Sequence, residues 1–360
     1  MDSTNSKKET YRATGLMSGT SLDGVDIAFC TFEKTETEWS YRIEKAETIP
    51  YPDTWKNRLS GLENQDALTF AKADSEYGHY LGKITDRFLR KHDLKPFFIA
   101  SHGHTIFHQP GSGFTSQIGK GPAIAAETGY PVVCDFRSTD VAFGGQGAPL
   151  VPAGDRFLFG EYTYCLNLGG FANISFEKSG QRIAFDICPA NIVLNYLVAS
   201  LEKEYDDGGK SARRGKLHKP LLEALDSLIF YQTPPPKSLG KEWVLAEVHP
   251  LLNQFAIPVE DKLRTYTEHI AGQVVRVAGK TDTGSLLITG GGAFNTFLIE
   301  KIRENARLTV ILPDPLTINF KEALIFAFLG VLRWRGEVNC LKSVTGARID
   351  TIGGAIYQAF

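Results

Sequence analysis

Residues 15–26 read Gly15-Leu16-Met17-Ser18-Gly19-Thr20-Ser21-Leu22-Asp23-Gly24-Val25-Asp26, a glycine-rich turn between two runs of strand-like composition. The runs 11–16 and 25–32 suit β-strands, and Gly19 and Gly24 permit backbone conformations that a Cβ forbids. Free N–H groups and hydroxyls in such a turn can close around phosphate oxygens. The stretch predicts a phosphate-binding hairpin, and the alternative interpretation is an ordinary hairpin loop.

A second strand, glycine turn and strand occur roughly one domain length downstream. Residues 163–168 are apolar, Gly169 and Gly170 stand in the turn at 169–173, and residues 174–176 suit a returning strand. Tight hairpins are common, so coincidence is the competing interpretation. We expect two similar halves, each of which carries one glycine turn.

Length and composition exclude several classes of protein. The 360 residues favour about two domains. The 39 Lys and Arg residues nearly balance the 41 Asp and Glu residues, so no strong field indicates nucleic acid or an anionic membrane as a partner. Residues 1–10 lack the apolar segment of a signal peptide, and no uninterrupted apolar run is long enough to span a membrane. The 5 widely spaced cysteines are typical of reduced thiols, so we expect a cytoplasmic protein.

The remaining pattern is that of an α/β protein, in which strands run into polar, glycine-rich loops beside helices. Strands are expected at 97–101, 131–135, 182–187 and 285–289, and helices at 66–92, 259–278 and 321–334, with a further helix that Pro189 opens. Residues 101–108 are expected to form a polar loop.

The sequence gives little support to the familiar nucleotide-binding motifs or to a metal site. No Gly-x-x-x-x-Gly-Lys-[Ser/Thr] sequence is present, which argues against a P-loop. Gly290-Gly291-Gly292 follows a strand without the spacing of a dinucleotide fingerprint, so it either lets an adenine or ribose approach the backbone or forms a simple turn. His102, His104 and His108 lack a supporting ligand set, so no protein-bound metal is predicted.

Three charged residues are candidates for a site. Asp186 lies where a strand meets a helix, a position from which a catalytic carboxylate can project. Glu322 opens an apolar helix and either favours the helix dipole or holds sugar hydroxyls. Arg137 follows an apolar strand and either pairs with an acid or fixes an anion.

Motifs along nearly the whole chain resemble, in order, those of the anhydro-N-acetylmuramic acid kinase family. Besides residues 15–26, these motifs are Ser101-His102-Gly103, Gly121-Pro122-Ala123, Asp135-Phe136-Arg137-Ser138, Gly144-Gly145-Gln146-Gly147-Ala148-Pro149-Leu150-Val151-Pro152, Leu166-Asn167-Leu168-Gly169-Gly170, Phe185-Asp186, Pro235-Pro236-Lys237-Ser238, Gly290-Gly291-Gly292-Ala293-Phe294-Asn295, Glu322-Ala323 and Val344-Thr345-Gly346-Ala347. A resemblance with this coverage is highly specific.

The resemblance implies a two-lobed α/β fold of the actin, hexokinase and Hsp70 type, in which a ribonuclease H-like motif is duplicated and ATP lies in the cleft between the lobes. The lobes are expected at residues 1–140 with 345–360 and at residues 141–344. The implied reaction needs ATP and Mg²⁺. Water attacks the anomeric carbon of 1,6-anhydro-N-acetylmuramic acid, the bridge opens, and O6 takes the γ-phosphate. The product is N-acetylmuramic acid 6-phosphate, in peptidoglycan recycling, and a homodimer is compatible with the sequence.

The resemblance also assigns site residues. Asp186 is the implied general base that activates the water, and His102, Arg137 and Glu322 are the implied sugar contacts. The implied ATP contacts are Gly15, Ser18, Gly19, Thr20, Ser21, Asp23, Asn167, Gly169, Gly170, Gly290, Gly291, Gly292 and Asn295. Within this set the residues of the two turns would hold phosphates, and residues 290–295 would face the adenosine.

The chain departs from the family pattern in two places. Members usually read Asp-Thr-Gly-Pro-Gly-Asn where this chain has Asp186-Ile187-Cys188-Pro189-Ala190-Asn191, and His104 replaces the usual glutamine. These changes leave open the phosphate contacts near Ile187 and the identity of the sugar. The alternatives are an actin-like ATP-binding sensor that has lost catalysis and a kinase of another sugar.

Overall fold

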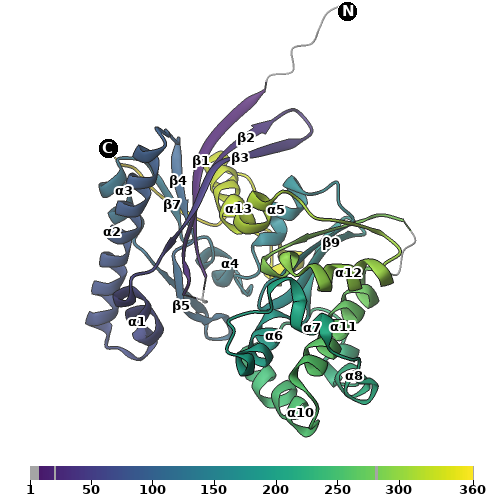
Figure 1. Ribbon diagram of the computed structural model, residues 1–360. Coiled ribbons are helices and arrows are strands. Elements are labelled where there is room, and N and C mark those ends of the chain that lie inside the picture. Colours follow the sequence, from purple (N-terminus) through teal and green to yellow (C-terminus); the bar gives the residue numbers. More distant parts are fainter. Residues whose placement is uncertain (1–7, 20–21, 280–282, 360) are drawn as a thin grey trace, which may run out of the picture. The chain divides into compact units, whose positions relative to one another are not determined.

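The computed structural model describes residues 8–19, 22–279 and 283–359, and it divides into two compact units (Figure 1). Unit 1 comprises Met1–Phe159 and Phe320–Phe360, and unit 2 comprises Gly160–Asn319. From the sequence we expected one lobe at residues 1–140 with 345–360 and the other at residues 141–344. The difference arises from two helices, at 151–158 and 320–335, which pack within unit 1.

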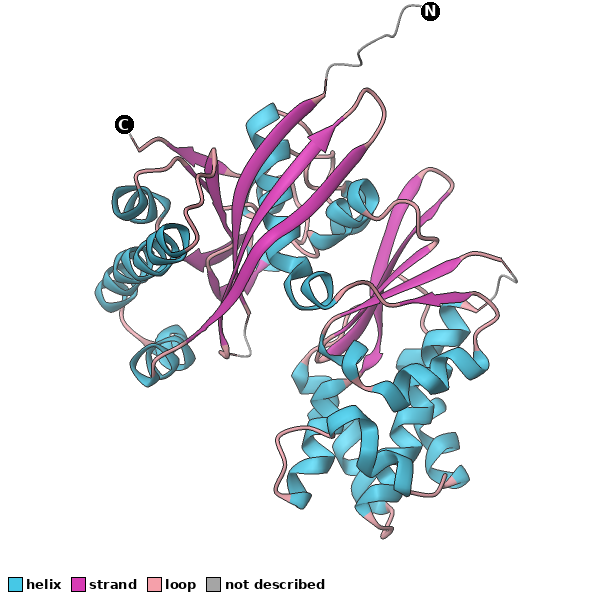
Figure 2. Cartoon of the chain, turned by 45° about the horizontal axis from the view of Figure 1, so that its top comes forward, coloured by secondary structure: helices cyan, strands magenta, loops and turns pink. Residues whose placement is uncertain are grey.

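Unit 1 is built on a six-stranded mixed sheet in the order β13-β7-β4-β1-β2-β3 (Figure 2). Its strands are β1 (Glu9–Ser18), β2 (Gly24–Lys34), β3 (Trp39–Pro50), β4 (Phe98–Ser101), β7 (Val132–Cys134) and β13 (Ala355–Tyr357). The first three form an antiparallel meander, and β4 and β7 continue the sheet parallel to β1. The hairpin predicted around residues 15–26 is therefore confirmed, whereas β3 was not predicted.

A small two-stranded sheet accompanies the main sheet of unit 1. It pairs β5 (His104–Gln109) with β6 (Phe114–Ile118). The expectation of a polar loop over residues 101–108 is wrong for its second half. The reason is that β5 gains its ladder from β6, a partner that the sequence of residues 101–108 alone does not reveal.

The helices of unit 1 cover both faces of its large sheet. They are α1 (Asp53–Gly61), α2 (Ala67–Lys91), α3 (Gly121–Thr128), α4 (Ser138–Ala142), α5 (Val151–Leu158), α13 (Pro315–Arg335) and α14 (Lys342–Thr345). The side chains of α2 join Leu16, Ile27 and Ile99 in one buried cluster. On the opposite face α13 approaches so closely that a Cβ on Gly15 would lie 1.9 Å from the backbone oxygen of Ala323.

The buried helix predicted at 321–334 is confirmed as part of α13. Its side chains from Ala323 to Leu332 are almost all fully buried. Its length and composition would also suit a membrane span, but 78% of its apolar stretch is buried inside the protein. Burial against the sheet therefore accounts for its apolar composition. The helix bends at Phe320 (φ −116°, ψ 15°), where the two units are divided.

Unit 2 carries a five-stranded sheet in the order β10-β9-β8-β11-β12. Its strands are β8 (Tyr164–Leu168), β9 (Phe171–Lys178), β10 (Gln181–Pro189), β11 (Ser285–Thr289) and β12 (Thr309–Ile311). Again the first three are an antiparallel meander, and β11 and β12 run parallel to β8. The second hairpin is confirmed, with a turn of only two residues, Gly169 and Gly170.

Helices of unit 2 pack on this sheet around a second core. They are α6 (Asn191–Val198), α7 (Lys210–Arg214), α8 (Lys219–Asp226), α9 (Lys241–Trp243), α10 (His249–Gln254), α11 (Val259–Ala278) and α12 (Thr296–Asn305). Short turns of other helical types in unit 2 are η3 (Ala199–Leu201), η4 (Asp207–Gly209), η5 (Ile229–Gln232), η6 (Val244–Val248) and η7 (Gly291–Phe294), and those in unit 1 are η1 (Leu62–Asn64) and η2 (Pro110–Ser112). The core joins residues of β8, β10 and β11 with those of α6 and α11.

The two large sheets share one topology. In each, the third, second and first strands are followed by two strands parallel to the first, with β13 as an additional edge strand in unit 1. The glycine turn connects the first strand to the second in both units. The predicted duplicated α/β fold is thereby confirmed.

Candidate active site

In unit 1 the first glycine turn leaves the end of β1. Ser18 is buried, and its hydroxyl lies 2.6 Å from the hydroxyl of Tyr51 and 2.7 Å from Nδ1 of His104. Asp23 is exposed beyond the turn. The side chain of Ser18 therefore points into the protein. Thr20 and Ser21, two of the predicted ATP contacts, lie outside the described residues.

Glycine is required at position 15 for packing, because any Cβ there would collide with the backbone of α13. This requirement is sufficient to explain the residue without a ligand. Gly19 is half-buried and lies directly after the strand, where its carbonyl accepts the N–H of Leu22 at 3.4 Å.

The second glycine turn, in unit 2, is attached to the start of α6. The carbonyl of Gly170 accepts the N–H groups of Ala190 at 2.8 Å and Ile192 at 3.2 Å, and the carbonyl of Gly169 accepts that of Asn191 at 3.2 Å. The turn thus satisfies N–H groups that a helix start leaves without intrahelical partners. Among the described residues the N–H of Gly170 itself has no acceptor.

Unit 2 brings the second turn together with residues 290–292. A Cβ on Gly290 would lie 2.5 Å from Oδ1 of Asn167, and one on Gly292 would lie 2.6 Å from Cβ of Leu168. Gly290 also has φ +82°, a conformation that favours glycine. Six of the predicted ATP contacts therefore lie in one small region: Asn167, Gly169, Gly170, Gly290, Gly291 and Gly292.

Three glycines of this region are not required by packing. A Cβ on Gly170 would have Ile192 Cβ as its nearest neighbour at 4.0 Å, one on Gly291 would meet Asn191 at 3.8 Å, and one on Gly169 would meet Asn167 at 3.4 Å. These are ordinary contact distances, so the protein leaves open space beside the backbone. A ligand that approaches the backbone closely would explain the choice of glycine at these positions.

Asn191 was missed in the sequence analysis as a site residue. Its Nδ2 donates to the carbonyl of Leu168 at 3.2 Å, and its side chain lies beside Gly291 and Gly292. It therefore connects the two glycine segments. Asn191 directly follows Pro189-Ala190 at the start of a helix, and this position was the feature of the sequence that could have indicated a site residue.

Asn295, by contrast, serves as the N-cap of α12. Its Oδ1 accepts the N–H of Leu298 at 3.1 Å. Capping satisfies one of the free N–H groups at the helix start and explains an asparagine there. The side chain thus has a structural role in addition to the predicted contact with adenosine.

Asp186 lies near the end of β10, beside a β-bulge between Asp186 and Cys188. Its Oδ2 accepts the N–H of Leu239 at 2.8 Å, and its own N–H donates to the carbonyl of Lys237 at 3.1 Å. Oδ1 has no hydrogen-bond partner among the described residues. Burial raises the pKa of the carboxyl, which the N–H of Leu239 only partly offsets. The carboxylate of Asp186 is therefore a base with one free oxygen and with increased basicity.

In unit 1 the predicted sugar contacts His102, Arg137 and Glu322 come together. Nε2 of His102 lies 2.9 Å from Nη2 and 3.2 Å from Nε of Arg137. Since arginine only donates, His102 accepts at Nε2 and carries its proton on Nδ1, which lies 2.9 Å from the carbonyl of Gly103. Nη1 of Arg137 donates to the carbonyl of Gly147 at 2.6 Å.

Glu322 is the carboxylate of this group that the protein leaves without a partner. Its side chain makes no hydrogen bond with any described residue. Two effects raise the pKa of Glu322: burial, which is the larger, and the negative charge of Asp26. The positive charge of Arg137 opposes the rise. Asp26 was quoted only as part of a motif, and the structure adds it to the site as a second carboxylate near Glu322.

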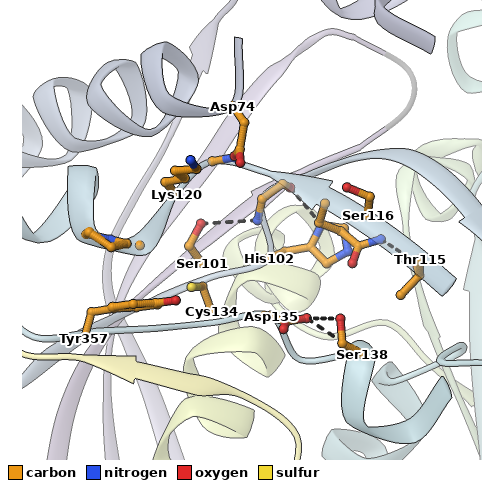
Figure 3. A pocket seen from close by; sticks show the side chains of 15 residues that line it. Asp74, Ser101, His102, Thr115, Ser116, Lys120, Cys134, Asp135, Ser138 and Tyr357 are labelled. Atoms are coloured by element: carbon orange, nitrogen blue, oxygen red, sulfur yellow. Dashed lines mark hydrogen bonds between the residues drawn. The ribbon is translucent and has the colours of Figure 1, made fainter. Parts of the chain in front are cut away.

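A cavity of about 470 Å³ in unit 1 is lined in part by His102 (Figure 3). Ser101, Lys120, Asp135 and Tyr357 also line it, and Asp135 accepts a hydrogen bond from the hydroxyl of Ser138. The lining offers hydroxyls and charges of both signs. Such a lining suits a small polar ligand.

The three histidines that could suggest a metal have other partners. His102 pairs with Arg137, His104 with Ser18, and His108 with Thr115. Within the described residues no three His, Cys, Asp or Glu side chains are grouped so as to hold a metal ion.

We predict that stability falls in acid through His104. Burial lowers its pKa to about 4 from 6.5, so between these values the unfolded chain binds a proton that the folded chain does not. The loss of stability caused by His104 is absent above pH 6.5 and grows as the pH falls. It reaches about 3 kcal/mol near pH 4. Denaturant unfolding of wild type and His104→Asn at pH 7, 6, 5 and 4.5 measures it. Between pH 7 and pH 4.5 the variant should lose less stability than the wild type. If the free energy of unfolding falls in parallel for both proteins, the prediction is contradicted.

Comparison of the sequence with known proteins identifies its family. The family model for anhydro-N-acetylmuramic acid kinase matches residues 11–359. A protein named anhydro-N-acetylmuramic acid kinase from Pasteurella multocida (strain Pm70) is 37% identical over 98% of this chain and 98% of its own length. A protein of the same name from Sulfurovum sp. (strain NBC37-1) is 35% identical over 97% of this chain and 99% of its own length.

Among solved structures, the activator of the 2-hydroxyisocaproyl-CoA dehydratase from Clostridium difficile with bound ADPNP is similar to this chain with a TM-score of 0.42. The two are 14% identical over 91% of this chain and 98% of the activator. The assignment rests instead on the match of sequence over the whole length. The chain belongs to the anhydro-N-acetylmuramic acid kinase family.

Proposed function

We propose that this chain is an ATP-dependent kinase that opens 1,6-anhydro-N-acetylmuramic acid with water and phosphorylates its O6. Membership of the family and the name of its relatives support the activity. The observation that carries the mechanism is the carboxylate of Asp186, which has one oxygen held by Leu239, one oxygen free and a raised pKa.

In the proposed mechanism Asp186 removes a proton from water while the water oxygen bonds to the anomeric carbon. The bond between this carbon and O6 breaks, and O6 leaves with its electron pair. It then attacks the γ-phosphorus of ATP, and ADP departs. The proton held by Asp186 is released to solvent afterwards. A positioned base of this kind contributes about 10²–10⁴ in rate.

The sugar contacts in this proposal are Arg137, His102 and Glu322. The side chain of Glu322 has no hydrogen-bond partner within residues 8–19, 22–279 and 283–359, and it can accept hydrogen bonds from sugar hydroxyls. Arg137 is oriented by the ring of His102 and the carbonyl of Gly147, so its guanidinium is held before the substrate arrives. Pre-orientation reduces the entropy cost of binding.

The phosphate contacts are the backbone groups of the two turns. The N–H of Gly170 and the open space beside Gly169 and Gly291 suit phosphate oxygens. Mg²⁺ binds proteins through one or two carboxylates together with nucleotide phosphates, and the exposed carboxylate of Asp23 fits that requirement. When bound, the ion neutralises charge on the β- and γ-phosphates.

The cellular setting is part of the proposal. Phosphorylation of an anhydro amino sugar suits peptidoglycan recycling, as the family name suggests. All 5 cysteines are free, and Cys30, Cys165, Cys188 and Cys340 are buried, which supports a reducing compartment such as the cytoplasm. A homodimer and the lack of nucleic acid or membrane partners stay predictions.

Asp186→Asn should abolish turnover and leave ATP binding nearly intact. Asparagine retains the acceptor for Leu239 but cannot take the proton, so we expect a loss of about 10²–10⁴ in kcat. Mass spectrometry of the 6-phosphate and calorimetry of ATP binding measure the two quantities. The exposed Glu204→Gln is the control. Unchanged turnover of Asp186→Asn would refute the assignment of the base.

Gly170→Ala should weaken ATP binding without weakening the fold. The added Cβ would meet no atom of the described residues closer than 4.0 Å, so the free energy of unfolding should change by less than about 0.5 kcal/mol. A phosphate that approaches this backbone would be displaced, and the KM for ATP should rise. Gly61→Ala, which also has free space, is the control and should alter neither quantity. An unchanged KM for Gly170→Ala would remove this turn from the phosphate site.

A further inference from the structure

Four buried polar groups form a chain behind the first glycine turn. The hydroxyl of Tyr77 contacts that of Tyr51, Tyr51 lies 2.6 Å from the hydroxyl of Ser18, and Ser18 lies 2.7 Å from Nδ1 of His104. All four residues have less than a twentieth of their surface exposed. Buried hydrogen bonds of this kind are costly to break because water cannot replace the lost partner.

The chain of polar groups contacts both ends of the turn. Ser18 is the last residue of β1, and Tyr51 donates its backbone N–H to the carbonyl of Asp23, at 3.4 Å, on the other side of the turn. Tyr51 follows β3, and His104 begins β5. Elements distant in sequence thus hold the two ends of the segment from Ser18 to Asp23.

The direction of the hydrogen bonds determines which nitrogen of His104 carries its proton. If Tyr77 donates to Tyr51, Tyr51 to Ser18, and Ser18 to His104, every hydroxyl proton has an acceptor. In the reverse direction the fully buried proton of Tyr77 is left with Ser18, with which Tyr77 also interacts, as its acceptor. We take the first direction, in which the neutral ring of His104 accepts at Nδ1 and carries its own proton on Nε2, as part of the inference, and the tautomer tests it.

We propose that His104 is a positioning residue for the first glycine turn. Its Nδ1 accepts the hydroxyl of Ser18, and together with Tyr51 it fixes the end of β1 from which the turn departs. The inference rests on the proposed function, in which this turn contacts ATP. It assigns the ring a role that does not require contact with either substrate.

The test compares His104→Phe, which keeps a ring and removes the acceptor, with His104→Asn, whose Oδ1 takes the place of Nδ1. For His104→Phe we expect the KM for ATP to rise about tenfold, the size expected for one lost buried hydrogen bond, with the KM for the anhydro sugar unchanged. His104→Asn should restore most of the affinity. His108→Asn, on the exposed part of the same strand, is the control and should behave as wild type.

Two further measurements cover the case in which His104→Phe does not fold. Tyr51→Phe removes the donor to Ser18 and should raise the KM for ATP in the same selective way. Nitrogen NMR of the wild-type protein should show His104 as the Nε2–H tautomer. A merely structural role would lower the active fraction, and hence kcat, without a selective change in the KM for ATP.

The outcomes separate the two proposals. If the wild-type protein binds ATP and both His104→Phe and Tyr51→Phe keep the normal KM for ATP, the role of His104 is overturned. The proposed function then stays intact. An Nδ1–H tautomer also overturns the role of His104. Wild-type protein that does not bind ATP overturns the proposed function, and the inference with it.

Discussion

The carboxylate of Asp186 is subject to two opposing effects, burial and one backbone hydrogen bond. Burial disfavours the charged form, and the N–H of Leu239 favours it, with the balance toward a raised pKa. The bulge between Asp186 and Cys188 places the carboxylate where one oxygen stays free. The proposed reaction depends on this balance, because a fully stabilised carboxylate would be a poor base and an unheld one would be poorly oriented.

The duplicated topology explains why two glycine turns stand in equivalent positions. In each unit the turn joins the first two strands of an antiparallel meander, and the parallel strands lie on the other side of the first strand. The reasons for glycine nevertheless differ. Gly15 lies within β1 and is dictated by its approach to α13, whereas beside Gly169 and Gly170 of the second turn the described residues stay at ordinary contact distance. Equivalent turns therefore do not mean that every glycine of the two motifs has the same role.

Much of the fold could be predicted from local pattern. The helix at 259–278 and the strand at 285–289 were predicted with the bounds observed, because periodicity and apolar composition are strong there. Strands β3 and β5 were missed, since each is defined by pairing with a partner more than by its own composition. The boundaries between units depend on where α5 and α13 pack, which no local signal reveals.

The candidate site was predictable in its residue types and less so in its contacts. The sequence indicated Asp186, Arg137 and Glu322, and the structure brings the last two together with His102. It did not indicate that Ser18 faces inward or that Asn295 caps a helix. Such roles depend on which hydrogen-bond partner lies nearest in space, and that information is carried by tertiary structure.

The most direct test is a titration of Asp186 in the intact protein. Carbon NMR of the labelled carboxyl should give a pKa above its ordinary 3.8, and the acidic limb of kcat/KM should have the same midpoint, because protonation removes the base. A carboxyl that titrates at or below 3.8, or an acidic limb with a different midpoint, would contradict this account of the reaction.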